Sequence, residues 1–216
     1  MHKYWLKYAK GENVRFISHL DLLRAMDRAI RRAGVPIAYS QGFNPHPKLS
    51  FATPLSVGVV SHGDYLEMEL TEELEPQDIM ETMNPKLPEG IEILEMEKLD
   101  GRKPTLGAIV AATLYKVEIK DDLDNQIQEL LNEKELMIER TNKKGTKIID
   151  IRPLIYNIYT KGNCIYMLLA TSSSANVKPK EVLNLLSIDN PNIDKEETFC
   201  RDENEKFITP LEWLKN

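Results

Sequence analysis

The chain alternates apolar and polar positions in two patterns, one typical of strands and one typical of helices. Residues 3–8 and 64–70 place apolar side chains at every second position, as a half-buried strand requires. Residues 19–33 instead repeat them every three or four positions, the period of an amphipathic helix. A short helix over 76–83 and a strand over 91–97 follow. With one more strand counted between the long helix and residues 64–70, the order is strand, helix, strand, strand, helix, strand, which is the split βαβ pattern of ferredoxin-like folds.

The long helix carries signals at both of its ends. Ser18 and Asp21 have the spacing of a capping box at its start. Gly34 directly follows its last apolar position and predicts the C-terminal stop. The side chains expected to form its core face are Leu20, Leu23, Met26, Ile30 and Ala33.

A similar order of elements begins again beyond residues 100–107, a segment with the Gly and Pro content of a linker. The elements expected there are a strand over 113–120, a helix over 121–135, long strands over 147–160 and 164–171 joined at 161–163, a helix over 179–186 and a strand over 198–201. We therefore predict an α+β protein of two ferredoxin-like halves, residues 1–99 and 108–216, packed together through their sheet faces.

Composition places the chain among ordinary soluble proteins. Hydrophobic residues make up 42% and charged residues 29% of it. No stretch approaches the roughly 18 consecutive apolar residues of a membrane span, and the first residues carry charges where a signal peptide needs an apolar run. Cys164 and Cys200 are too few for a disulfide framework or a thiolate metal site. We expect a cytoplasmic protein without membrane contact.

The net charge of −6 conceals an uneven distribution. Residues 1–60 hold nine Lys and Arg against three Asp and Glu, which leaves 19 basic and 31 acidic groups for residues 61–216. Such asymmetry indicates that the basic part meets an anion, often nucleic acid. The alternative is that the two parts neutralise each other across a domain interface.

The segment AYSQGFNPHPKLSF, residues 38–51, is too rich in proline for a helix. Asn44 and His46 each precede a proline, which biases both toward extended geometry. A stiff backbone presents side chains at low entropic cost, and histidine is the side chain that most often changes charge near neutral pH. His46 and Lys48 are therefore candidates for binding a phosphate or for acid–base catalysis. The alternative is a β-turn in which His46 only hydrogen-bonds a carbonyl group.

Arginines recur along the helix that precedes this segment. Arg24, Arg28 and Arg31 form a basic stripe, although a solvated face with ion pairs within the helix would explain part of this pattern. The candidate residues for binding RNA or another substrate are Arg15, His19, Arg24, Arg28, Arg31, Ser40, Gln41, Asn44, His46 and Lys48.

The outer face of the first predicted sheet is a third candidate surface. Trp5 and Tyr65 should lie close together there, on the strands where RNA-recognition domains place stacking aromatics. Glu67 and Glu69 share this face and should pair with Lys3 and Lys7, which favours a seat for the second half of the chain over an RNA platform. The histidines have no zinc-ligand spacing, and the sequence contains no P-loop, dinucleotide fingerprint, nucleophile elbow or three-cysteine cluster.

Three segments of the chain match a known family: VRFISHLDLLRAMDRAIRRAGVPIAYSQGFNPHPKLSFATPLSVG, IIDIRPLI and KPKEVLNLL. With them the chain resembles the bacterial radical SAM-linked protein family, a domain of unknown function. The likeness spans nearly the whole chain, and its N-terminal part is the most specific. Members of that family occur beside a radical SAM protein or fused to its C-terminus, and their genes tend to neighbour those of an endoribonuclease and ribosomal proteins.

The resemblance implies an accessory protein that presents RNA, or a ribosome- or tRNA-linked substrate, to a radical SAM partner. The chain would need no cofactor or metal of its own, because the partner would hold S-adenosylmethionine and an iron–sulfur cluster. Two alternatives stay open: a metal-independent RNA-processing enzyme that uses His46 and Lys48, and a module that only docks the partner protein. DNA binding is not expected.

Overall fold

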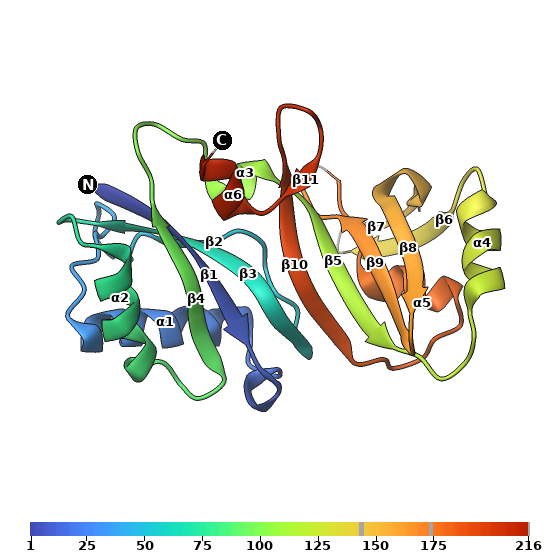
Figure 1. Cartoon of the computed structure of the whole chain (residues 1–216), viewed down its shortest axis with the longest axis horizontal. Coiled ribbons are helices and arrows are strands. Elements are labelled where there is room, and N and C mark those ends of the chain that lie inside the picture. Colours follow the sequence, from blue (N-terminus) through green and yellow to red (C-terminus); the bar gives the residue numbers. More distant parts are fainter. Residues whose placement is uncertain (143–144, 173–174, 216) are drawn as a thin grey trace.

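Strands from both halves of the chain line up in one sheet, with helices packed against it (Figure 1). The computed structural model describes residues 1–142, 145–172 and 175–215. Its strands are β1 (His2–Lys10), β2 (Leu49–Phe51), β3 (Val59–Leu70), β4 (Ile91–Lys98), β5 (Val110–Glu118), β6 (Met137–Asn142), β7 (Gly145–Asp150), β8 (Ile155–Lys161), β9 (Cys164–Ala170), β10 (Ile193–Arg201) and β11 (Phe207–Ile208). Its α-helices are α1 (His19–Ala33), α2 (Pro76–Met83), α3 (Leu106–Ile109), α4 (Asp124–Asn132), α5 (Pro179–Leu185) and α6 (Pro210–Lys215). None of these helices is long and apolar enough to cross a lipid bilayer.

The order of the strands is β4-β1-β3-β10-β5-β9-β8, with the short β2 and β11 paired to β3 and β10. Every neighbouring pair is antiparallel except β3 and β10, which are parallel. The α+β class is therefore confirmed. The predicted packing through sheet faces is wrong, because an edge of β3 in the first half pairs with an edge of β10 in the second.

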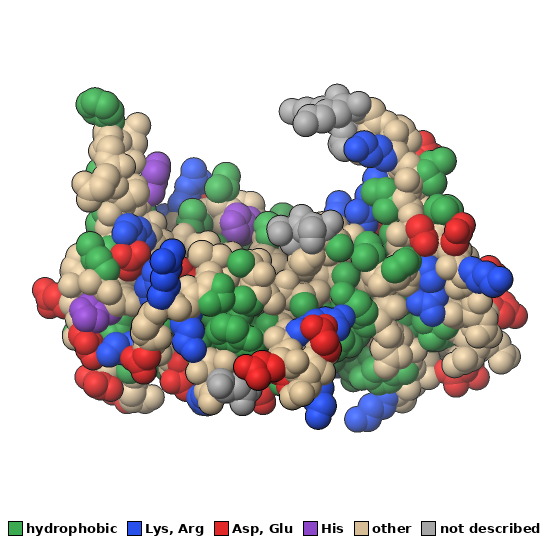
Figure 2. All heavy atoms as spheres, turned by 90° about the horizontal axis from the view of Figure 1, so that it is seen from above, with side chains coloured by type: hydrophobic (Ala, Val, Ile, Leu, Met, Phe, Trp, Pro, Cys, Tyr) green, Lys and Arg blue, Asp and Glu red, His purple; other side chains and the backbone are tan. Residues whose placement is uncertain are grey.

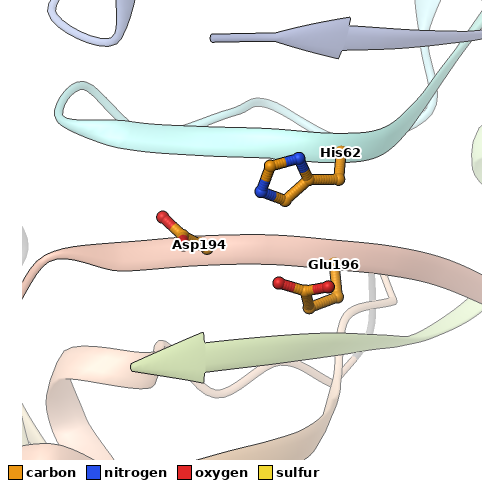
Figure 3. Close-up of side chains that lie close together, drawn as sticks. All are labelled: His62, Asp194 and Glu196. Atoms are coloured by element: carbon orange, nitrogen blue, oxygen red, sulfur yellow. The ribbon is translucent and has the colours of Figure 1, made fainter. Parts of the chain in front are cut away.

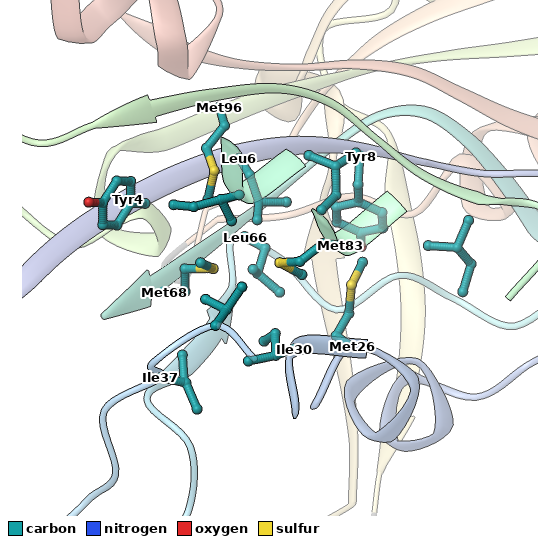
Figure 4. Close-up of a cluster of buried hydrophobic side chains, with 14 of the residues drawn as sticks. Tyr4, Leu6, Tyr8, Met26, Ile30, Ile37, Leu66, Met68, Met83 and Met96 are labelled. Atoms are coloured by element: carbon teal, nitrogen blue, oxygen red, sulfur yellow. The ribbon is translucent and has the colours of Figure 1, made fainter. Parts of the chain in front are cut away.

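The first half folds around α1 and α2, whose side chains meet those of β1, β3 and β4 in one core (Figure 4). As predicted, the Oγ of Ser18 accepts a hydrogen bond from the backbone of Asp21, and Gly34 ends the helix in left-handed geometry with φ of 70°. The predicted core face is wrong in part, because Leu20 is 60% exposed and Leu23 is only half-buried. The buried positions are Leu22, Ala25, Met26, Ala29 and Ile30. The prediction counted large apolar residues, whereas two alanines take part in the face that packs on the sheet.

The second half departs from the predicted elements in several places. β10 begins at residue 193 and not at 198, and β11 and α6 are not predicted at all. The strand predicted over 147–160 is interrupted by a 3₁₀ turn at Arg152–Leu154, where Pro153 has no N–H to donate to a sheet. β7 therefore ends before this turn and pairs with β6, a strand that the apolar pattern does not reveal. The two form a hairpin apart from the large sheet.

The outer face of β1 and β3 is covered by α3, at the end of the predicted linker, and by α6. Trp5 and Tyr65 lie in one buried cluster there, as predicted, and the ring of Trp213 lies 6.1 Å from that of Trp5. This face is therefore a packing surface and not an RNA platform. The expected Lys3–Glu67 pair is present at 3.3 Å. The predicted pairing of Glu69 and Lys7 within this set is wrong. Glu69 instead pairs with Lys48, which directly precedes β2, and Lys7 pairs with Glu197 on β10.

The junction of the two halves contains a buried ion pair. The Nζ of Lys195 on β10 lies 2.9 Å from the Oδ1 of Asp64 on β3, and both side chains are almost wholly buried. The hydroxyl of Tyr8 donates to the other carboxylate oxygen of Asp64 at 3.2 Å. Burial, followed by the charge of Asp64, raises the pKa of Tyr8 well above its usual value, so Tyr8 stays a neutral donor. Asp64 thus joins strands from both halves.

Gly63 brings the backbones of β3 and β10 close together beside this ion pair. A Cβ at this position would lie 2.8 Å from the carbonyl oxygen of Glu196 and 2.7 Å from a carboxylate oxygen of Glu197. Any side chain would therefore push the two strands apart, and only glycine fits.

Replacing Lys195 with Met should lower the free energy of unfolding by about 3–5 kcal/mol, because Asp64 would remain buried without its counter-ion. The double variant Asp64→Asn with Lys195→Met should lose less, since a neutral amide needs no ammonium partner. Urea unfolding measures both variants. The exposed Lys206→Met serves as a control and should change stability by at most about 0.5 kcal/mol. A loss at Lys195 no larger than at Lys206 would contradict the role of the ion pair.

Candidate functional site

The segment between α1 and β2 forms a projecting loop that is fastened at its base. Ser40 and His46 exchange two hydrogen bonds: the Ser40 N–H donates to the His46 carbonyl at 2.8 Å, and the His46 N–H donates to the Ser40 Oγ at 3.0 Å. The Lys48 N–H adds a bond to the Ala38 carbonyl at 2.8 Å. The intervening side chains point into solvent, and that of Phe43 is fully exposed. The loop therefore holds an aromatic ring away from the body of the protein.

His46 and Lys48 line one shallow groove of about 260 Å³. The ammonium of Lys48 is already held by Glu69, with 2.9 Å between Nζ and Oε1. Glu67 and Glu69 also line the groove, which makes it unfavourable for a phosphate. No contact within the described ranges orients the imidazole of His46. His46 and Lys48 thus lie along the same groove, as the sequence hypothesis requires, but the ammonium of Lys48 is already paired with Glu69.

Some arginines of α1 form ion pairs within the helix, and all of the stripe lies at the surface. Arg24 pairs with Asp21 at 3.2 Å and Arg31 with Asp27 at 3.0 Å, and all of these contacts lie at the surface. Arg28 is also exposed. Exposed pairs of this kind are weak and can exchange for a phosphate. The stripe therefore remains accessible to an anionic polymer, and its last member, Arg31, lies over the ring of Tyr39 at the base of the projecting loop.

Two predicted residues of the basic surface lie elsewhere. The guanidinium of Arg15 donates to the Gly58 carbonyl and to the Asn192 side chain, and only 11% of its side chain is exposed. It therefore ties the segment before β3 to the segment before β10. The ring of His19 packs edge-on against Phe51 at 4.9 Å, and its Nδ1 is buried. Gln41 and Asn44 are exposed on the projecting loop.

A second candidate site lies where the two halves meet. This junction pocket, about 420 Å³ in volume, lies between the segment after β2, the middle of β5 and the segment that leads into α5. Its polar side chains include those of Thr53, Ser56, Tyr115, Thr171, Asn176 and Lys178. Burial, with a smaller effect of Asp64, raises the pKa of Tyr115 to about 12, so its hydroxyl is neutral. These residues come from segments far apart in the chain, and no local motif predicts the pocket.

The molecule is also hollowed on the side that lies farthest from the viewer in Figure 1. The space-filling view from above shows this hollow between two projecting arms (Figure 2). One arm lies over the end of the molecule that carries α1 and α2, and the other over the end that carries β6. Both ends have exposed apolar side chains, among them Phe43 and Ile148.

The described residues offer one group of side chains with the chemistry of a metal site. His62 on β3 lies beside Asp194 and Glu196 on β10, and their potential ligand atoms all lie within 4.8 Å of one another (Figure 3). This donor set suits a divalent cation. Glu196 also raises the pKa of Lys116, so a nearby ammonium already supplies positive charge to these carboxylates. The cluster accommodates a cation but does not require one.

Comparisons with known proteins identify the family of this chain but assign it no activity. No curated protein matches this chain. Among solved structures, the crystal structure of an unknown protein from Galdieria sulphuraria covers 90% of this chain and 97% of its own, with 11% identity and a TM-score of 0.29. That likeness is too weak to support an inference about fold or function. The family model described as "Uncharacterized protein conserved in bacteria (DUF2344)" matches residues 3–179, and the chain therefore belongs to this bacterial family.

Proposed function

We propose that this chain is an accessory protein that binds RNA and presents it, or a ribosome- or tRNA-linked substrate, to a radical SAM enzyme. One observation carries the RNA part of the proposal: the projecting loop holds Phe43 fully in solvent, and Arg31 of the α1 stripe lies over the ring of Tyr39 at the base of that loop. Exposed aromatic rings stack on unpaired bases, and arginines contact the phosphates between them. The excess of basic residues in positions 1–60 supports the same conclusion.

Binding is a better explanation of the loop than catalysis. General acid–base work needs a donor and an acceptor in fixed mutual geometry. Lys48 is committed to Glu69, and the imidazole of His46 is exposed without an orienting contact among the described residues. The loop backbone is stiff, whereas its charged groups are not arranged as a reacting pair. This combination suits recognition.

The radical SAM partner in this proposal rests on the family resemblance of the sequence. In this scheme the partner carries S-adenosylmethionine and the iron–sulfur cluster. The cysteines support that division, because Cys164 and Cys200 are both buried free thiols. Burial also raises the pKa of Cys200 to about 12, which makes its thiolate form scarce.

We further infer that each half is a ferredoxin-like unit and that the boundary lies within residues 100–107. Support comes from the strand order, which is β4-β1-β3-β2 in the first half and β10-β5-β9-β8 in the second. Both follow the fourth-first-third-second order of that fold. In the second half, the β6–β7 hairpin is an insertion between the first helix and the second strand.

Replacing Arg24 and Arg28 together with Ala should weaken RNA binding and reduce its dependence on salt. Each lost contact to a single strand should lower the slope of log affinity against log salt by about 0.7. Fluorescence anisotropy with a labelled single-stranded RNA at several salt concentrations measures this slope. The double variant Lys161→Ala with Lys206→Ala removes the same charge from the second half and should keep the wild-type slope. If both double variants show the same slope of log affinity against log salt, α1 is not part of the RNA-binding surface.

Substituting Phe43→Ala should lower RNA affinity by about 1–3 kcal/mol, the usual contribution of a base-stacking ring. Its thermal stability, and that of His46→Ala, should change by no more than about 0.5 kcal/mol, because both side chains lie in solvent. Phe16→Ala, at another exposed ring, is the matched control and should bind RNA normally. If Phe43→Ala binds RNA as tightly as wild type, the loop is not the recognition element.

The accessory role predicts that the intact chain co-purifies with its radical SAM partner and with RNA. Sequencing the retained RNA would identify the substrate class. Recovery of the partner with no RNA would favour a module that only docks protein. RNA cleavage by the isolated chain, lost in His46→Ala, would favour the enzyme alternative.

A further inference from the structure

Polar side chains are concentrated in the buried junction between the halves. The buried polar and charged residues identified in the described chain are Lys10, Ser61, Asp64, Thr113, Lys195 and Thr198. They stand on β1, β3, β10 and β5, which are neighbours in the sheet. The Oγ of Ser61 has no hydrogen-bond partner among the residues that the structure describes. A buried hydroxyl in this state calls for a further polar group, from water or from a ligand.

The strand register connects this strip to the junction pocket. Ser61, Lys195 and Tyr115 are direct partners across β3, β10 and β5, and Tyr115 lines the pocket. Thr53 lines it too, and its Oγ1 lies 3.2 Å from the Nζ of Lys195. A lysine ammonium has three N–H donors. Asp64 and Thr53 take two of them within the described contacts. A buried ion pair, whose ammonium keeps a further N–H donor, therefore lies behind the pocket wall.

The lining of the pocket favours an anion. Among its described lining residues there is no aspartate or glutamate, in contrast to the groove beside His46. Lys178 supplies a second ammonium, and hydroxyl and amide groups supply several more donors. A phosphoryl group, with three acceptor oxygens, can use more of these donors than a carboxylate can. Pro54, Val177 and Pro179 form an apolar part of the wall.

We propose that the junction pocket binds a phosphomonoester of nucleotide size. Its phosphoryl group would meet Lys178 and the hydroxyls of Thr53 and Tyr115, and the apolar wall would cover the rest of the ligand. The volume of about 420 Å³ lies within the range of small-molecule pockets, which often occur between domains. The site is distinct from the projecting loop, so it stands whether or not the loop binds RNA.

Calorimetric titration of the intact chain with adenosine 5′-monophosphate tests this site. Adenosine should bind at least tenfold more weakly, and inorganic phosphate should compete where acetate does not. Lys178→Ala and Tyr115→Phe should each weaken nucleotide binding by about tenfold, the loss expected for a hydrogen bond to a charged group. Lys180→Ala, an exposed lysine two residues further along in the first turn of α5, is the control and should bind normally. Equal binding of nucleotide and nucleoside, or equal behaviour of Lys178→Ala and Lys180→Ala, would overturn the proposal.

The phosphomonoester can be a free nucleotide or the end of an RNA chain, and two oligonucleotides distinguish these sources. If the pocket takes RNA ends, a 5′-phosphorylated oligonucleotide should bind more tightly than its 5′-hydroxyl counterpart, and Lys178→Ala should abolish the difference. If it takes free nucleotides, the oligonucleotides should bind alike while the nucleotide still binds. Phe43→Ala should leave nucleotide binding unchanged, which separates failure of this site from failure of the loop. No preference for the phosphorylated form in either arm would contradict the inference.

Discussion

The parallel pairing of β3 with β10 is the contact on which the shape of the molecule depends. Its ladder consists of three residue pairs, from Ile193 with Val59 to Lys195 with Ser61. Two conditions make so short a contact specific. Gly63 permits the close approach of the backbones, and the buried ammonium of Lys195 must meet the carboxylate of Asp64. Buried ion pairs add little net stability but strongly penalise arrangements that separate them. The junction is therefore selective about which sheet edges meet.

Local signals in the sequence predict most elements of the first half and fail where distant segments meet. Ser18 and Gly34 define both ends of α1 because capping depends on neighbouring residues. The rotation of that helix depends on how closely Ala25 and Ala29 approach the sheet, which a count of large apolar residues does not measure. The interruption at Pro153 can be read from proline chemistry, yet the apolar residues on both sides of it suggest one long strand. The edge-to-edge junction depends on Lys195, whose partner lies far away in the chain.

The same distinction separates the two candidate sites. The projecting loop is contiguous in sequence, and its prolines, its glycine and His46 mark it without any structure. The junction pocket combines Thr53, Tyr115 and Lys178, and none of these residue types is unusual by itself. Its character comes from a buried strip of polar groups that the strand register assembles. Function in this protein therefore has to be sought both in the projecting loop and at the junction, where local motifs give no indication.

The long separation of Asp64 and Lys195 also affects how the protein is made. The two residues lie 131 positions apart, so at about 5–20 residues per second a ribosome adds the lysine roughly 7 to 26 seconds after the aspartate. During that interval the nascent first half holds a carboxylate without its counter-ion and a strand edge without its neighbour. An open edge of this kind can pair with strands of other chains. Emergence of β10 from the ribosome closes the edge and neutralises the charge in one step, so a strand translated late completes the half that was translated first.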